Sequence, residues 1–260
     1  MATSEMTFWD HLDELRSSLL RILAVVVLLA VGVFFLLPSL FDPIILGPCF
    51  GDFLTYRWFC DLGDVFGLSS TFCDTSFNVA MINLELTAQF LLHLRVAFLL
   101  SLVLGCPYLL YEVWRFVKPA FYANERKAFS LAFLLGGSLF YVGLVICYLF
   151  IFPITLRFLI GYQVSGHVVN QLSLTSYMST FLNLHLVFGL VFEMPMVALI
   201  LSKMGLITRD FFKRWRRHAI VLLVFIAALI TPTGDPFTLA LVSVPLYLLY
   251  ELSAKLVRKA

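Results

Sequence analysis

The sequence predicts an all-α integral membrane protein with six transmembrane helices, the last two short, and both termini in the cytoplasm. Of its 260 residues, 61% are hydrophobic and 13% are charged, whereas soluble domains have about 45–50% apolar and about 25% charged residues. The apolar runs are long and do not alternate, unlike the ~10-residue strands of outer-membrane barrels. In addition, 15 of the 18 Lys and Arg residues fall on one side of the predicted spans.

Residues 1–16 are expected to form an interfacial helix on the cytoplasmic surface. Thr7 is a candidate N-cap, and the apolar residues that follow it recur at helical spacing. This segment is acidic and amphipathic, which is not typical of a cleavable signal peptide. It continues into a first span over residues 17–37, and we expect Pro38 to end that helix.

The rest of the chain divides into a loop and five further spans. Residues 38–84 are rich in Gly, Pro and Asp, which predicts a large periplasmic loop with short ordered pieces. Further spans are expected at 86–114, 128–152 and 174–201, with Pro153 ending the third and a loop over 155–173. The last two, 215–230 and 237–252, have 16 residues each. Each would cover only ~24 Å of a hydrocarbon core of about 30 Å, so they should thin the bilayer or leave part of it uncovered.

The positions of the charges and cysteines indicate which side is which. Only Arg57, Arg95 and Arg157 lie on or near the acidic side, so the positive-inside rule places both termini in the cytoplasm. Three cysteines, at positions 49, 60 and 73, fall in the periplasmic loop, where one disulfide and one free thiol are expected. The sequence does not say which two of them pair. The other two, at positions 106 and 147, lie in spans and are expected to be small apolar fillers.

No pattern of catalytic or metal-binding residues stands out. The histidines are scattered, and the sequence contains no nucleotide-binding or hydrolase motif. We therefore expect no enzyme activity, no cofactor or metal, and no nucleic-acid partner.

Carboxylates in unusual positions are more informative. Glu14, with Arg16 beside it, lies at the cytoplasmic boundary, where such charges can simply face water. Glu125 precedes the third span, where it can simply complement a helix dipole.

Glu193 lies near the middle of the fourth span. A carboxylate at that depth is costly and suggests a function, although it can also hold helices together through hydrogen bonds. One function class is a proton-coupled small-solute transporter with Glu193 as the proton carrier. That class needs a second ionisable residue nearby, and the candidate is Arg95, which is more simply explained by its reaching toward the outer surface. Another function class is a purely structural scaffold, whose function would tolerate neutralisation of Glu14 or Glu125.

Four segments together resemble the TatC family of the twin-arginine translocase (Sec-independent protein translocase), in the same order along the chain. They are HLDELR at 11–16, the stretch from Pro107 through YEVWRF and PAFY to Glu125-Arg126, FEMP at 192–195, and the stretch from Thr231 to Glu251. The chain has Thr-Pro-Thr-Gly-Asp where the family usually has Thr-Pro-Pro-Asp, so the equivalence of Asp235 to the family's acid stays open. The long cysteine-bearing first loop is a second departure.

The resemblance implies a receptor in the bacterial inner membrane that binds signal peptides carrying paired arginines. With small single-span proteins of the TatA and TatB types, such a protein moves folded proteins by the proton-motive force. The resemblance also implies self-association and contact with membrane lipid. The residues implied for the arginine pair are Glu14 and Glu125, with Arg16 and Phe116 beside them. Those implied for partner docking are Glu193 and Pro195, and the other motif residues are Pro107, Pro119, Asp235 and Glu251.

Elementary chemistry agrees with these assignments. A guanidinium group pairs bidentately with a carboxylate, which lysine cannot do. Two arginines therefore need two carboxylates, and Glu14 and Glu125 are expected at the same cytoplasmic depth on different segments. Glu112 is the next candidate if Glu125 does not take part.

Overall fold

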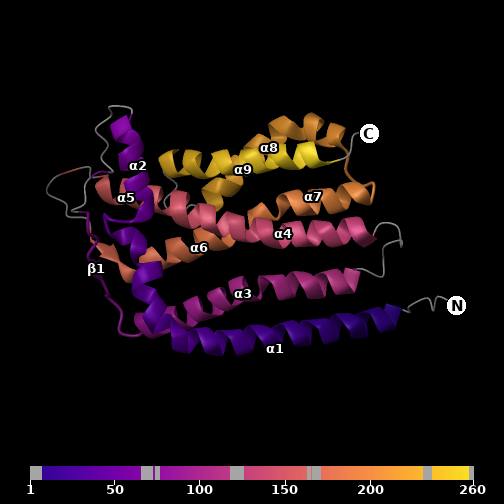
Figure 1. Cartoon of the computed structure of the whole chain (residues 1–260), viewed down its shortest axis with the longest axis horizontal. Coiled ribbons are helices and arrows are strands. Elements are labelled where there is room, and N and C mark those ends of the chain that lie inside the picture. Colours follow the sequence, from indigo (N-terminus) through magenta and orange to yellow (C-terminus); the bar gives the residue numbers. More distant parts are fainter. Residues whose placement is uncertain are drawn as a thin grey trace.

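The computed structural model describes residues 8–65, 73, 77–117, 126–162, 165, 171–230 and 236–257. Over these residues the chain is mostly helical, and its long helices lie side by side (Figure 1). Five helical stretches of this part of the chain are long and apolar enough to cross a membrane: Leu12–Cys49, Ala88–Phe116, Phe133–Gly161, Leu174–Lys203 and Pro236–Leu256. Helix α1 begins and helix α9 ends at the same end of the bundle (Figure 1).

Helix α1 (Phe8–Leu40) is one continuous helix of 33 residues that includes residues 8–16 of the predicted interfacial segment and the first span. Pro38 lies inside it, so the prediction that Pro38 ends the helix is wrong. The chain continues as the π-helical turn η1 (Phe41–Ile45) and the 3₁₀ turn η2 (Gly47–Cys49). Proline removes a backbone donor, and local π or 3₁₀ geometry near a helix end accommodates the change in hydrogen bonding.

The segment predicted as a periplasmic loop is more ordered than expected. It contains helix α2 (Leu54–Val65) and strand β1 (Met81–Ile82). Strand β1 pairs in parallel with β2 (Leu172–Ser173), which directly precedes α6. Two segments that are distant in the sequence are thereby joined at one end of the bundle. We call the elements at this end, η2, α2, β1 and β2, the outer cap.

Tyr56 joins α2 to η2 and α5 through hydrogen bonds. Its hydroxyl donates to the carbonyl oxygens of Pro48, at 2.9 Å, and Pro153, at 3.2 Å. The guanidinium of Arg157 lies over the Tyr56 ring, 4.7 Å from its centroid. Burial raises the pKa of Tyr56, and the charge of Arg157 opposes that rise. The phenol is therefore neutral and acts as a hydrogen-bond donor.

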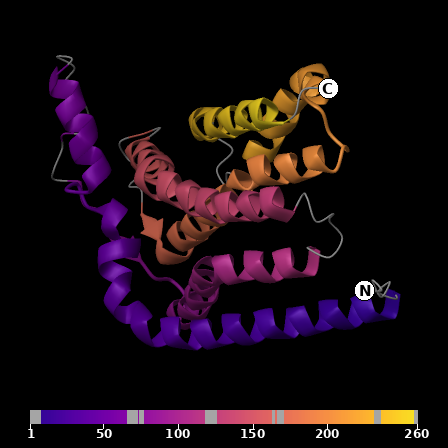
Figure 2. The same cartoon turned by 45° about the vertical axis from the view of Figure 1, so that its right-hand side comes forward.

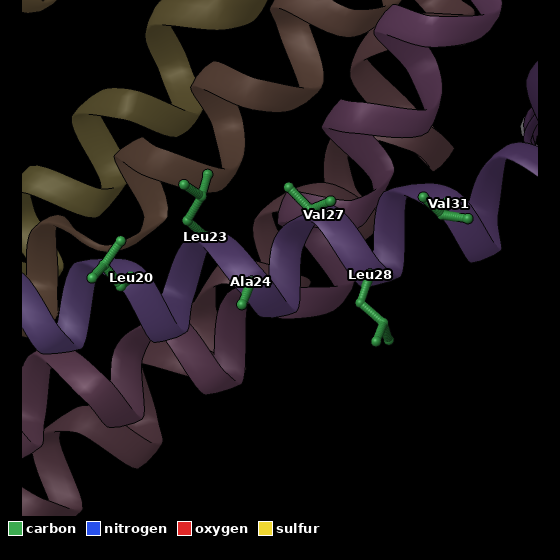
Figure 3. Close-up of a pocket in the computed structure, with 6 residues that line it drawn as sticks. All are labelled: Leu20, Leu23, Ala24, Val27, Leu28 and Val31. Carbon is green, nitrogen blue, oxygen red and sulfur yellow. The ribbon is translucent and has the colours of Figure 1, made fainter.

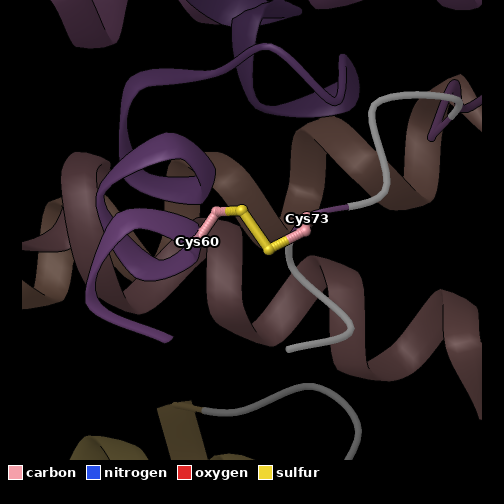
Figure 4. Close-up of a disulfide and its surroundings, with 2 residues drawn as sticks. All are labelled: Cys60 and Cys73. Atoms are coloured by element: carbon pink, nitrogen blue, oxygen red, sulfur yellow. A yellow bond between two sulfur atoms is a disulfide. The ribbon is translucent and has the colours of Figure 1, made fainter. Parts of the chain in front are cut away.

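A disulfide joins Cys60 of α2 to Cys73 (Figure 4). Cys49 is buried and free. The prediction of one disulfide and one free thiol among the three cysteines of this segment is therefore confirmed, and the structure identifies the pair. Cys106 and Cys147 are buried and free as well.

Helix α3 (Ala88–Val117) returns antiparallel to α1, and α4 (Arg126–Ile146) follows it. Helix α4 continues through the π-helical turn η5 (Cys147–Ile151) into α5 (Phe152–Gly161). The prediction that Pro153 ends the third helix is therefore wrong, as is the predicted loop from residue 155 as far as Gly161. Proline is tolerated in the first turn of a helix, and Pro153 occupies that place in α5 after the π turn.

Helix α6 (Leu174–Phe192) is separated from α7 (Met194–Lys203) by a single non-helical residue, Glu193. The Ser173 hydroxyl caps α6 by accepting a hydrogen bond from the Ser176 amide at 3.2 Å. The predicted fourth span thus contains a break at its intramembrane glutamate.

The last two helices are longer than predicted. Helix α8 (Arg209–Ile230) has 22 residues and α9 (Pro236–Leu256) has 21, so the prediction of 16-residue helices is wrong in length. The apolar run within each helix has only 16 residues, as counted from the sequence. Each helix extends beyond that run into charged residues. Helix α8 begins with the basic stretch that includes Lys213–Arg217, which explains why it is absent from the five apolar stretches.

The buried core is centred on α6, with further residues from α3, η5, α5, α8 and α9, while α1 lies at the edge of the bundle against α3 (Figures 1 and 2). Gly143 of α4 packs against α6, because a Cβ there would lie 2.7 Å from Phe192 and 2.8 Å from the Phe188 carbonyl oxygen. By contrast, an apolar stretch of α1 from Leu20 to Val31 lines an open hollow of about 580 Å³ (Figure 3). Such a surface suits lipid contact.

Candidate functional site

An ion pair between α1 and α3 organises the end of the bundle at which the chain begins. Arg21 donates from Nε to Oε1 of Glu112 at 3.1 Å and from Nη2 to Oε2 at 3.0 Å. The Tyr108 hydroxyl donates to Glu112 Oε1 at 3.0 Å, and Arg21 also reaches Ser18 Oγ at 2.9 Å. Glu112 is 1% exposed. Its carboxylate is therefore held bidentately by a guanidinium of the chain itself, and one further donor completes the site.

Glu14 lies nearer the N-terminus on the same helix. It is half-buried, and its Oε2 atom is buried with no hydrogen-bond partner among the described residues. The contacts of Arg21 with Glu112 and of His93 Nε2 with the Phe34 carbonyl oxygen, at 2.8 Å, give the antiparallel register of α1 and α3. The seven residues from Glu14 to Arg21 correspond to roughly 10 Å of helix. Glu14 is therefore level with the end of α3, near its last residue, Val117.

The remaining residues expected at this edge are partly placed. Arg16 is exposed on α1, and Phe116 is half-buried in the last turn of α3. Glu125 and Pro119 lie outside the described residues, so the structure does not test whether Glu125 meets Glu14. Pro107 lies inside α3, nearer the middle of that helix.

Glu193 occupies the junction of α6 and α7. Both of its carboxylate oxygens are buried, and neither has a hydrogen-bond partner in the part of the chain that the structure describes. Its Oε2 lies so close to Gly136 of α4 that a Cβ on that glycine would be 2.7 Å away. Pro195 lies in the first turn of α7, where its missing N–H costs nothing. The carboxyl group is thus enclosed by α4 and α7 with its hydrogen-bonding capacity unused.

Glu251 of α9 has partners in the neighbouring helix and in its own. Arg216 of α8 donates to Oε1 from Nε at 2.5 Å and also pairs through Nη2, and the Tyr247 hydroxyl donates to the same oxygen at 2.9 Å. This cluster joins α8 to α9. The other motif acid, Asp235, lies outside the described residues.

Sequence reasoning missed two polar features of the bundle. It proposed Glu112 only as a substitute and did not identify its partner Arg21, although both lie toward the same ends of adjacent spans. It also passed over His185 of α6, whose Nδ1 lies 2.7 Å from the Phe181 carbonyl oxygen. Arg95 contacts Asn183 Oδ1 at 3.4 Å. No group of three or more His, Cys, Asp or Glu among the described residues could hold a metal ion.

The fold and these polar groups define a multi-pass helical membrane protein with glutamates at one edge and inside the bundle. Residues 10–245 match the sequence profile of the family described as Sec-independent protein translocase protein (TatC). The chain belongs to this family, and its role is in twin-arginine protein translocation.

Relatives and solved structures agree with this assignment. The chain is 33% identical over 251 residues to the Sec-independent protein translocase protein TatC of Blattabacterium sp. subsp. Periplaneta americana, covering 96% of this chain and 94% of that protein. It is 34% identical over 253 residues to the protein of the same name from Deinococcus radiodurans, covering 96% and 85%. A crystal structure titled twin arginine translocase receptor TatC in DDM superposes with a TM-score of 0.76 at 29% identity, covering 95% of this chain and 98% of that one.

Proposed function

We propose that this chain is the signal-peptide receptor and core subunit of a twin-arginine translocase, which exports folded proteins by the proton-motive force. The observation that carries the proposal is the contrast between Glu112 and Glu14. The carboxylate of Glu112 is already held by Arg21, whereas Glu14, two turns away on α1, has a buried oxygen without a partner among the described residues. A guanidinium from outside the chain can meet that need.

The two arginines of the signal peptide require two carboxylates, and we assign them to Glu14 and Glu125. Segment 118–125 follows Val117 directly in sequence, and the α1–α3 register puts Glu14 level with the end of α3. Arg16 and Phe116 flank the site. A partly desolvated arginine–carboxylate pair is stronger than an exposed ion pair, which contributes about 0–1 kcal/mol.

The basic surroundings limit how the peptide is recognised. The same end of the protein carries the Lys and Arg excess, including the basic start of α8, and this excess repels a basic ligand. Charges are screened beyond about 8–10 Å at physiological salt. Recognition in this site therefore depends on short-range contact with the acidic pair and not on long-range attraction.

We assign Glu193, with Pro195 beside it, to the docking of a small single-span protein of the TatA or TatB type. A polar side chain on such a helix would satisfy the unpartnered carboxyl oxygens. The proton-coupled transporter is less well supported. Arg95, its expected second ionisable group, contacts Asn183 and not Glu193. His185 lies eight residues before Glu193 on α6, roughly 12 Å along the helix.

A double-mutant cycle on signal-peptide affinity tests the arginine site. Glu125→Gln keeps size but removes charge, and it should weaken binding by about 1–3 kcal/mol, the contribution of a charged hydrogen bond. Replacement of the two signal arginines by lysines should weaken binding to the native chain more than to Glu125→Gln, because the variant has already lost the bidentate partner. Glu14→Gln should behave in the same way.

Glu112→Gln is the matched control, because the carboxylate of Glu112 is already paired with Arg21. Its effect should add to that of the lysine replacement without coupling, with protein level checked in each variant. If Glu14 and Glu125 show additive effects while Glu112 shows coupling, the arginine pair binds at Glu112 and our assignment is wrong.

A further inference from the structure

The basic side chains at the start of α8 divide between two sides of the helix. Arg216 faces α9, where it pairs with Glu251. Lys213, Arg214 and Arg217 are exposed, and none of them forms an ion pair with another described residue. In the described part of the chain, three cations of this stretch are therefore open to an anion from outside the protein.

The exposed face of α8 changes from basic to apolar within one turn. The arginines at 214 and 217 are followed, at four-residue spacing, by Val221 and Phe225, and residues three or four apart share one side of a helix. Val221 is 70% exposed and Phe225 is 66% exposed, whereas Leu223 on the opposite side is buried. A lipid acyl chain can therefore lie along the same face from which the two arginines project.

The length of α8 places these arginines at the edge of the hydrocarbon. The helix ends on the side of the outer cap, because Phe237 soon after it stacks on Phe158 of α5 with ring centroids 4.1 Å apart. The 13 residues that follow Arg217 in α8, up to Ile230, cover roughly 20 Å of a hydrocarbon core of about 30 Å. Trp215, which is 47% exposed, lies between the two arginines, and tryptophan favours the membrane–water interface. The guanidinium groups thus lie beside the lipid headgroups, where a charge without a counter-ion is costly.

The chemistry of this face selects the kind of lipid. A guanidinium group pairs bidentately with a phosphate, while the choline of a zwitterionic headgroup is repelled by a cluster of cations. Asp210, one turn before Arg214, is exposed and forms no ion pair with it among the described residues, so the face stays net positive. The positive-inside rule puts this side in the cytoplasm, and cytoplasmic leaflets carry anionic lipids.

We propose that this face of α8 is a binding site for an anionic phospholipid of the cytoplasmic leaflet. Arg214 and Arg217 hold the phosphate, and one acyl chain lies along Val221 and Phe225. The site requires that α8 cross the membrane, and it does not depend on the signal-peptide site at Glu14.

Photolabelling of the full chain in nanodiscs of phosphatidylcholine tests the proposal. The probes are phosphatidylglycerol and phosphatidylcholine with the same diazirine in the same acyl chain, so that they differ only in the headgroup. The phosphatidylglycerol probe should label the α8 peptide that contains Val221 and Phe225 more strongly. Each arginine should contribute about fivefold to this preference, the factor that one basic residue gives at an anionic lipid surface.

Arg214→Gln combined with Arg217→Gln should lower labelling by phosphatidylglycerol to the phosphatidylcholine level and leave labelling by phosphatidylcholine unchanged. Arg16→Gln combined with Lys203→Gln is the matched control, because it removes the same charge from exposed positions on other helices. The control should keep the native preference. An equal loss in the control would mean that net charge alone attracts the lipid, and this result would overturn the site.

Two further outcomes decide the question on the native sequence around the site. Equal labelling of the native α8 peptide by both probes would overturn the selectivity for an anionic headgroup. A photo-crosslinking amino acid in place of Phe225 in native membranes should yield a phospholipid adduct. A protein adduct there would instead assign the face to an acidic protein partner, and the lipid site would be wrong.

Discussion

The glutamates of the bundle differ in how their carboxyl groups are satisfied. Glu112 and Glu251 each have an arginine and a tyrosine of the chain as donors. Glu14 and Glu193 have buried oxygens without a partner among the described residues. A buried polar atom without a hydrogen bond costs free energy. The latter two are therefore the positions at which an external partner gains most by binding.

Glu193→Ala tests the assignment of this residue to partner docking. It should leave signal-peptide crosslinks from Glu125 intact while lowering co-purification of the small single-span protein, and transport, severalfold. Glu193→Gln keeps the shape and an acceptor oxygen, so it should retain more of the assembly than Ala does. The measurement is quantitative pull-down of the small protein with crosslinking done in parallel. Loss of signal-peptide crosslinks with assembly unchanged would reverse the assignment.

At the scale of helices, the sequence predicts which helices form better than it predicts where each helix ends. Apolar runs identify every long helix, but the two prolines at 38 and 153 were expected to end helices and instead lie inside or at the start of helical segments. Local π geometry next to them supplies the alternative hydrogen bonding, and no composition rule shows this in advance. The lengths of α8 and α9 were underestimated because charged residues extend a helix past its apolar run.

The candidate site was predictable only in part for a similar reason. Edge carboxylates such as Glu14 stand out in the sequence, since charges are rare next to long apolar runs. Pairing across helices depends on rotation and register, which a sequence does not contain. For that reason Glu112 was recognised as a candidate while Arg21, its partner on another helix, was not.

Close packing of α4 on α6 depends on Gly143. The Cβ of Gly143→Ala would lie 2.7 Å from Phe192 and 2.8 Å from the Phe188 carbonyl oxygen, and the latter cannot move without shifting the helix. We expect a loss of about 1–3 kcal/mol in the free energy of unfolding, as overpacking typically causes. Gly32→Ala is the control, since nothing lies within 4 Å of its Cβ, and it should be neutral or slightly stabilising.

Unfolding of both variants in mixed micelles, followed by circular dichroism, measures the difference. Equal stability of the two variants would contradict the role of Gly143 as a close helix contact. A loss for Gly32→Ala alone would instead indicate that α1 has a partner at its exposed face.

At the scale of the whole molecule, the arrangement of α8 bears on the number of membrane passes. Phe237, at the start of α9, stacks on Phe158 of α5 with ring centroids 4.1 Å apart, so it lies near the outer cap. The turn between α7 and α8 lies at the opposite end (Figure 1). Helix α8 joins these two ends, and its 22 residues cover roughly 33 Å, slightly more than a hydrocarbon core of about 30 Å. We therefore expect α8 to be the sixth pass despite its charged beginning.

Labelling with a membrane-impermeant maleimide tests both this pass and the orientation of the chain. The native cysteines give little background, because three are buried and the other two form a disulfide. Asp52→Cys in the outer cap and Phe237→Cys should be labelled in intact spheroplasts. Leu206→Cys, 67% exposed between α7 and α8, should be labelled only after permeabilisation, because the basic side stays in the cytoplasm. If Phe237→Cys and Leu206→Cys react from the same side, α8 does not cross the membrane. If Leu206→Cys reacts from outside while Asp52→Cys does not, the orientation is reversed, and the arginine site at Glu14 faces away from the compartment where signal peptides are made.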